Sequence, residues 1–218
     1  MPTIEQARAW YPSADPVHGF DHVLRVYAMA ERLAQAEGAD LEILHAAALL
    51  HDAVPPIDAD QSSLEKDARR LNHHATSAEF AGQVLAAEGW PADRITAVQH
   101  AIRAHRFRDR SEQPQTIEAQ VLFDADKLDA IGAIGAARAI AYAVQAGQPA
   151  YATPSQQFLE TGLLEPGEPH SAYHEHVFKL SRLKQQLYTH SARKIAVERH
   201  RFLEGFFAQL AAEMSGEA

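Results

Sequence analysis

The chain has 218 residues and a net charge of -9, from 20 Lys and Arg against 29 Asp and Glu. This balance excludes a protein that holds nucleic acid by its overall charge, and no apolar run reaches the roughly 18 to 20 residues of a membrane span. Because cysteine is absent, disulfides, thiol catalysis and iron–sulfur clusters are excluded, and histidine (13 residues) and carboxylates remain as strong metal ligands. The first residues lack a secretory pattern, so we expect a cytoplasmic protein.

Helical patterns follow one another along the first half of the chain, without the alternation typical of strands. Thr3 to Gln6 has the pattern of a capping box, Gly38 is placed to end a helix, and Asp40 is a suitable N-cap for the next one. We expect helices over about 3–12, 20–37, 41–53 and 91–105, a helix or a pair of helices over 62–89, and a loop at 54–61.

The second half of the chain continues the helical pattern after a polar loop at 106–115. Apolar spacing predicts one long helix from 116 to about 146, and two final helices over about 171–187 and 191–214. Between them, 147–169 is rich in Gly and Pro, which predicts a long loop of the kind that often forms a lid. We expect a single all-α domain, with its core at about 18–146 and C-terminal helices over 170–214.

His51 and Asp52 end an apolar run, Ala46 to Leu50, that must be buried. A histidine and a carboxylate at the end of a buried helix are costly unless they have partners. Adjacent helical side chains point about 100° apart, so both can reach one ion lying between them. The alternative is a histidine near the helix C-terminus and an aspartate that caps the loop.

Three carboxylates, Asp124, Asp126 and Asp129, lie in an otherwise apolar segment. Asp126 and Asp129 are three residues apart and share a helix face. Buried carboxylates need a cation, hydrogen-bond donors or a proton, so this group indicates a metal or phosphate site. The alternative is a solvated helix face.

Further histidines and arginines are candidates for the same site. His22 is four residues before the core position Val26, so its side chain should point inward, and Arg25 lies on the same predicted helix. Such a histidine is more often an ordinary core residue. The other candidates are His73, His74, His100 and His105, and the basic residues Arg103, Arg106, Arg108 and Arg110, which also fit a solvated helix end.

In combination, His22, His51-Asp52 and Asp126 resemble the His…His-Asp…Asp pattern of the HD-domain superfamily of metal-dependent phosphohydrolases. The segments 21–26, 37–40, 47–52, 101–105 and 123–135 are similar to one bacterial and archaeal branch, which contains predicted hydrolases and a nucleotide pyrophosphohydrolase. The resemblance extends over about 18–214 and includes 176–180 and 192–196.

The resemblance implies that His22, His51, Asp52 and Asp126 bind a divalent metal ion, with Mn²⁺, Mg²⁺, Fe²⁺ and Zn²⁺ left open. The remaining roles are expectations for the same site. We expect Asp124 or Asp129 to orient or deprotonate the attacking water, His105 to take part in catalysis, and substrate phosphates to be bound by Arg25, His73, Lys127 and Arg106. His73 and His74 cannot be separated by sequence, and a second metal at His73 and His105 is an alternative to one metal.

The expected activity is hydrolysis of a nucleotide or related phosphate ester, most specifically of nucleoside triphosphates to monophosphate and pyrophosphate. The alternatives are a phosphodiesterase for a cyclic or oligonucleotide, and a metal-bound nucleotide sensor without turnover. Ala53 to Pro56 replaces the acidic pair of guanosine-tetraphosphate hydrolases, and Arg106 to Arg110 replaces the Gly-Tyr-Pro motif of the cyclic-dinucleotide branch. Both of those activities are therefore disfavoured, and a homodimer is an open expectation.

Overall fold

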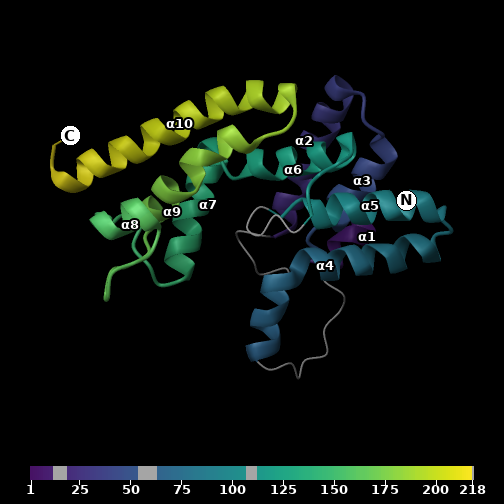
Figure 1. Cartoon of the computed structure of the whole chain (residues 1–218), viewed down its shortest axis with the longest axis horizontal. Helices are drawn as coiled ribbons and strands as arrows, with labels where there is room; N and C mark the ends of the chain where they lie inside the picture. Colours follow the sequence, from purple (N-terminus) through teal and green to yellow (C-terminus); the bar gives the residue numbers. More distant parts are fainter. Residues whose placement is uncertain (12–18, 54–62, 107–111, 218) are drawn as a thin grey trace. The chain divides into compact units, whose positions relative to one another are not determined.

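The computed structural model describes residues 1–11, 19–53, 63–106 and 112–217, and only the backbone of 63–72. The described residues form ten α-helices and one 3-10 helix and contain no strand, which confirms the all-α prediction. The elements are α1 (Ile4–Arg8), α2 (Phe20–Glu37), α3 (Leu41–Leu50), α4 (Ser63–Ala87), α5 (Ala92–Ala104), α6 (Ile117–Asp129), α7 (Gly132–Gln145), α8 (Gln156–Thr161), α9 (Ala172–Phe178), η1 (Leu180–Gln186) and α10 (His190–Ser215) (Figure 1).

The chain divides into two compact units, Met1–Asp126 and Lys127–Ala218. In the first unit, α3 contacts α1, α2, α4 and α5, and α4 packs against α5. The side chains of α3 from Ala46 to Leu50 are buried without exception. The first unit is therefore built around a short apolar helix whose C-terminal end leads directly into His51 and Asp52. The expectation of a single domain stays a prediction.

Local sequence signals set the helix ends of the first unit. The side chain of Thr3 caps α1 in a capping box with Gln6. Gly38 ends α2 in the left-handed conformation with φ 73°, which favours glycine. Asp40 caps α3 by accepting from the backbone N–H groups of Glu42 and Ile43. The sequence predicted each of these ends, whereas α3 stops at Leu50, three residues before the predicted end. The expected loop at 54–61 and the capping residue at 62 lie outside the described residues.

The second unit corrects the prediction of one helix over 116–146. Helix α6 ends at Asp129, and Ile131 adopts an extended conformation before α7 begins at Gly132. Gly132 has φ 79°, and a Cβ added at Gly135 would clash with the carbonyl oxygen of Ala130. The two glycines therefore allow the chain to turn sharply where the apolar pattern is continuous.

The predicted helix over 171–187 is also two elements. α9 ends at Phe178, and the 3-10 helix η1 follows. With about three residues per turn, the 3-10 geometry places Leu180 and Leu183 on one side, where both are buried. η1 and α7 both pack against α10, which buries Ala192, Ala196, Leu203 and Phe207 along one face.

The segment 147–169 is more ordered than the prediction of a loop, because it contains α8 and is fastened at Glu168. The Glu168 carboxylate accepts hydrogen bonds from the backbone N–H groups of Ser155 (2.6 Å) and Glu165 (2.7 Å), and from the Ser155 hydroxyl (2.8 Å). Its other contact is with Nε2 of the buried His174, at 3.0 Å. One carboxylate thus joins the beginning of α8 and the turn at Glu165 to α9.

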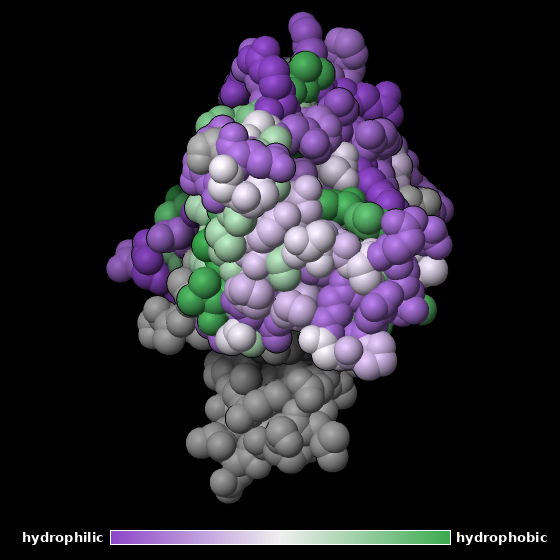
Figure 2. Space-filling view, turned by 90° about the vertical axis from the view of Figure 1, so that its left-hand side faces the viewer, coloured by the Kyte–Doolittle hydropathy of each residue, from purple (hydrophilic) through white to green (hydrophobic). Residues whose placement is uncertain are grey.

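None of the described helices is long and apolar enough to cross a membrane. The face drawn in Figure 2 is mostly hydrophilic, and its hydrophobic residues form small separate patches.

Candidate metal centre

The turn after α3 carries the two central residues of the site. The last three carbonyls of α3 have separate partners. Ala48 accepts from His51 Nδ1 at 2.8 Å, and Leu50 accepts from the backbone N–H of Ala53 at 3.2 Å. The carbonyl of Leu49 accepts from the hydroxyl of Tyr11 at 3.0 Å. These bonds hold His51 and Asp52 in a fixed turn at the end of a buried helix.

The bond to Ala48 also decides which nitrogen of His51 is available. Because Nδ1–H donates to the carbonyl, Nε2 carries a lone pair. Burial lowers the pKa of His51 to about 4, against partial compensation from Asp52, so the ring is neutral at physiological pH. A neutral imidazole with a free Nε2 lone pair is the form that binds a metal ion.

Asp52 is surrounded by histidine nitrogens on two sides. Its Oδ2 lies 3.5 Å from Nε2 of His51 and 3.9 Å from Nε2 of His22. Its Oδ1 lies 3.5 Å from Nε2 of His73 and 3.6 Å from Nε2 of His105. Burial raises the pKa of Asp52, but the neighbouring histidines, His51 foremost, outweigh it and hold the pKa well below its ordinary value. The carboxylate is therefore ionised.

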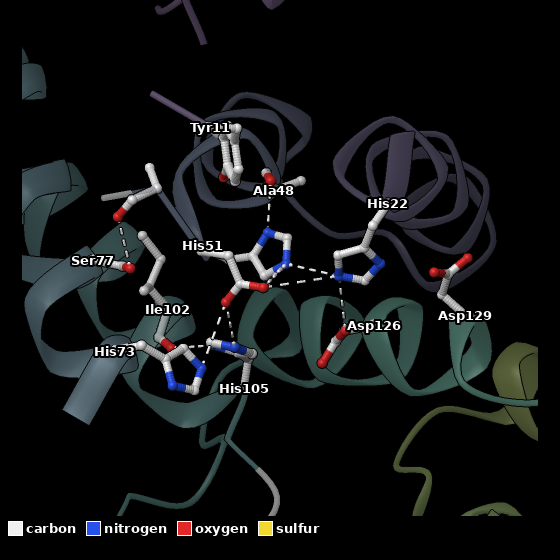
Figure 3. Close-up of polar contacts among 12 residues, drawn as sticks. Tyr11, His22, Ala48, His51, His73, Ser77, Ile102, His105, Asp126 and Asp129 are labelled. Atoms are coloured by element: carbon white, nitrogen blue, oxygen red, sulfur yellow. Dashed lines mark hydrogen bonds and ion pairs between the residues drawn. The ribbon is translucent and has the colours of Figure 1, made fainter. Parts of the chain in front are cut away.

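His22 brings α2 and α6 into the same cluster. Its side chain is 2% exposed, as expected from its spacing to Val26. Its Nε2 lies 3.4 Å from Nε2 of His51 and 3.4 Å from Oδ1 of Asp126 (Figure 3). The structure thus brings together all four residues that the resemblance implies as metal ligands.

The second side of Asp52 is formed by His73 from α4 and His105 from the end of α5 (Figure 3). The Nδ1 of His105 donates to the carbonyl of Ile102, so Nε2 is the ring nitrogen that faces Asp52. His74 points elsewhere, because its Nδ1 accepts from the guanidinium of Arg106 at 3.1 Å. The structure therefore separates His73 from His74, which the sequence could not do.

Among the described residues, two groups of ligand atoms converge closely enough to hold a metal ion: His22, His51 and Asp52, and Asp52, His73 and His105. Asp52 Oδ1 is a buried oxygen that accepts no hydrogen bond from the described residues. Lone pairs of imidazole nitrogens facing a carboxylate repel one another unless a cation or proton lies between them. The donor set therefore fits a divalent cation, with a mixture of nitrogen and oxygen ligands.

The two aspartates that were predicted to act on the attacking water, Asp124 and Asp129, both have buried side chains. Asp124 is completely buried on α6. Asp129 is buried as well, and its Oδ2 forms an ion pair with Arg138 at 2.7 Å. The ion pair gives Asp129 a stabilising contact within the second unit. The catalytic roles of both residues stay predictions.

The structure describes some, but not all, of the basic residues that were predicted to bind phosphate. Arg25 on α2 and Lys127 on α6 are half-buried, and their roles stay predictions. Arg103 is bound to Glu112, with Nε and Oε2 2.6 Å apart, and His100 contacts the same carboxylate. This ion pair fastens the end of the polar loop to α5. The other two arginines of the expected patch, Arg108 and Arg110, lie outside the described residues.

Sequence reasoning missed two hydroxyls beside the site. Tyr11 donates to the carbonyl of Leu49 at 3.0 Å. Ser77 donates to the carbonyl of Ala53 at 2.9 Å (Figure 3). Burial, reinforced by the charge of Asp52, raises the pKa of Tyr11 well above its ordinary value, so the hydroxyl keeps its proton. Ser77 follows His73 by four residues, a spacing that puts both on one face of α4, but no local pattern indicates the hydrogen-bond partner of either hydroxyl.

Residues 19–131 match the family described as HD domain. The chain belongs to the HD domain family. The uncharacterized protein YpgQ of Bacillus subtilis (strain 168) is 34% identical over 221 residues, which cover 97% of this chain and 94% of YpgQ. The matched segment contains Asp52 and the histidines around it. This HD protein is a metal-dependent phosphohydrolase.

Solved structures of HD relatives have the same fold. The crystal structure of B. subtilis YpgQ in complex with ADP has a TM-score of 0.70 and 31% identity, and the match covers 99% of this chain and 100% of that one. An HD-superfamily hydrolase from Bacillus thuringiensis has a TM-score of 0.65 and 27% identity, with 97% and 96% covered. This HD protein therefore resembles these relatives along nearly its whole length.

Proposed function

We propose that the protein hydrolyses nucleoside triphosphates to nucleoside monophosphate and pyrophosphate, with a divalent ion bound by His22, His51, Asp52 and Asp126. The observation that carries the proposal is the convergence of four imidazoles on the single carboxylate of Asp52. Such a centre suits an anionic substrate, because the cation offsets the negative charge of both the carboxylates and the phosphates. The complex of the relative YpgQ with ADP supports a nucleotide as the substrate.

A divalent ion in this set lowers the pKa of a coordinated water and polarises a phosphoryl oxygen. The protein side chains do the remaining work. The lone pair on Nε2 of His105 can accept a proton from the attacking water, because Nδ1–H is held by Ile102. His73 is 41% exposed at its side chain, so it can also meet a substrate that enters from solvent.

In the proposed reaction, water attacks the α-phosphorus of the nucleotide. The water oxygen forms a bond to this phosphorus, and the bond from it to the oxygen that bridges to the β-phosphorus breaks. That bridging oxygen leaves with pyrophosphate, and the proton of the water passes to His105. Arg106 follows His105 directly and contacts His74, which supports a role for its guanidinium in binding the oxygens of the leaving pyrophosphate.

Product analysis by phosphorus NMR tests the proposal. ATP incubated with the protein and Mn²⁺ or Mg²⁺ should give AMP and pyrophosphate, and a chelator should stop the reaction. Asp52→Asn should remove metal and activity together, whereas Asp93→Asn, at an exposed position of α5, should change neither. Formation of ADP and orthophosphate, or cleavage of monophosphates only, would refute the proposed reaction but not the metal-dependent hydrolase.

A further inference from the structure

Two hydroxyl groups from separate segments of the first unit hold the turn that carries His51 and Asp52. The hydroxyl of Tyr11, just after α1, donates to Leu49 at 3.0 Å, and the hydroxyl of Ser77, on α4, donates to Ala53 at 2.9 Å. Leu49 precedes the His-Asp pair by two residues, and Ala53 follows it directly. The five-residue turn is thus fastened on both sides of the pair.

The bond from Tyr11 replaces one that the helix cannot make. The carbonyls in the last turn of an α-helix have no partner within the helix, and α3 ends at Leu50. The backbone N–H of Ala53, which a longer α3 would direct to Leu49, donates to Leu50 instead. The hydroxyl of Tyr11 therefore satisfies a buried carbonyl for which the described residues offer no other donor. Leaving a buried carbonyl without a donor costs free energy that an exposed one would recover from water.

Tyr11 also reaches the beginning of α2. Its ring lies 5.5 Å from the ring of Phe20, centroid to centroid, and both side chains are buried. Phe20 precedes His22 by two residues, and the guanidinium of Arg8 lies over the Phe20 ring, 4.5 Å from its centroid. One side chain therefore contacts the two helix ends that carry His22 and His51.

Ser77 makes the corresponding connection to α4. It lies four residues after His73, so the two side chains share one helix face. Through Ala53, the hydroxyl fixes the distance between this face and the turn, and His73 Nε2 lies 3.5 Å from Asp52 Oδ1. The side chain of Ser77 is 2% exposed, so water does not replace the bond easily.

We propose that Tyr11 and Ser77 are positioning residues that set the geometry of the metal centre by holding the His51–Asp52 turn from two sides. Tyr11 lies outside the segment that matches the HD domain family, 19–131, so this part of the centre is supplied by the N-terminal helix region. The inference rests on the proposed metal centre and not on the identity of the substrate.

The test compares Tyr11→Phe and Ser77→Ala with Ser77→Thr, which restores a hydroxyl, and with Ser171→Ala, which removes a buried hydroxyl from α9 in the second unit. Each protein is titrated with Co²⁺ well below its melting temperature, and the visible absorption spectrum and the dissociation constant are recorded. Loss of one positioning hydrogen bond should weaken metal binding about three- to tenfold and shift the spectrum. Ser77→Thr should be close to the wild type.

Ser171→Ala should lower the melting temperature without changing the spectrum or the dissociation constant. The inference is overturned if Tyr11→Phe and Ser77→Ala behave in the same way as Ser171→Ala, because their hydroxyls then stabilise the fold only. Failure of the proposed reaction is distinguishable, since a wild-type protein that binds Co²⁺ but does not cleave ATP still reports on Tyr11 and Ser77. A wild-type protein that binds no metal overturns both.

Discussion

Nε2 of His22 and Nε2 of His51 lie 3.4 Å apart in the interior of the first unit, although the two residues come from different helices. The bond from His51 Nδ1 to Ala48 leaves a lone pair on His51 Nε2. Two imidazole nitrogens approach this closely when one donates a proton to the other or when both face a shared cation. With Asp52 and Asp126 beside them, the shared cation is the arrangement that we expect in the working protein.

The metal stoichiometry should distinguish the two ligand groups around Asp52. We predict one tightly bound ion per chain, held by His22, His51, Asp52 and Asp126, with His73 and His105 acting on the substrate. His73→Ala and His105→Ala should then keep one metal per chain by elemental analysis and lose mainly turnover. A fall from two ions to one in both variants would instead show a binuclear centre bridged by Asp52.

Arg106 and Arg103 make a matched pair for testing the phosphate site. Arg106 is held by His74 beside His105, whereas Arg103 is bound to Glu112. Arg106→Gln should raise the KM for triphosphates about tenfold, the effect of losing one charged hydrogen bond, with unchanged metal content. Arg103→Gln should leave the KM unchanged. Equal changes in KM for both variants would contradict the assigned role of Arg106.

Glu168 should stabilise the second unit through its charge. Burial raises the pKa of Glu168, but the N–H groups of Ser155 and Glu165, with His174, outweigh it and lower the pKa to about 2. Because the folded pKa is depressed, this stabilisation is present above pH about 4.5 and is lost as the pH falls towards 2. Glu168→Gln should lower the melting temperature at pH 7 in calorimetry, and the exposed Glu165→Gln should not. A difference at pH 7 that persists undiminished at pH 2 would contradict this account.

His176 should make stability fall in mild acid. Burial, partly offset by Glu204, lowers the pKa of His176, and its ring stacks on Phe207 at 4.3 Å. Below pH about 6.5 the unfolded chain takes up a proton that the folded chain does not, so stability decreases as the pH falls. In His176→Phe, which keeps a ring on Phe207, urea midpoints at pH 7.5 and 5.5 should differ less than in the wild type. The exposed His190→Gln is the control, and an equal difference in all three proteins would refute the prediction.

Signals that act within one turn of helix made much of the fold predictable. Gly38 and Asp40 end and begin helices through their own conformations and side chains. His22 was expected to point inward because it is one turn from Val26, and it is buried. The pattern of histidines and aspartates likewise led to a site that the structure assembles from α2, α3 and α6.

The remaining features depend on contacts between distant residues. The break before Gly132 follows from the approach of Gly135 to the carbonyl of Ala130, which an apolar pattern does not encode. Tyr11 and Leu49 are 38 residues apart in the chain, so no local pattern pairs them. Arg103 could not be assigned to Glu112 rather than to a substrate until the path of the loop end was known.

Isotope labelling tests the central claim most directly. ATP is hydrolysed by the metal-loaded protein in water enriched in oxygen-18, and the products are resolved by phosphorus NMR and mass spectrometry. Attack at the α-phosphorus predicts one labelled oxygen in AMP and none in pyrophosphate. Label in pyrophosphate or in orthophosphate would contradict the proposed reaction, because the water would then have attacked the β- or γ-phosphorus.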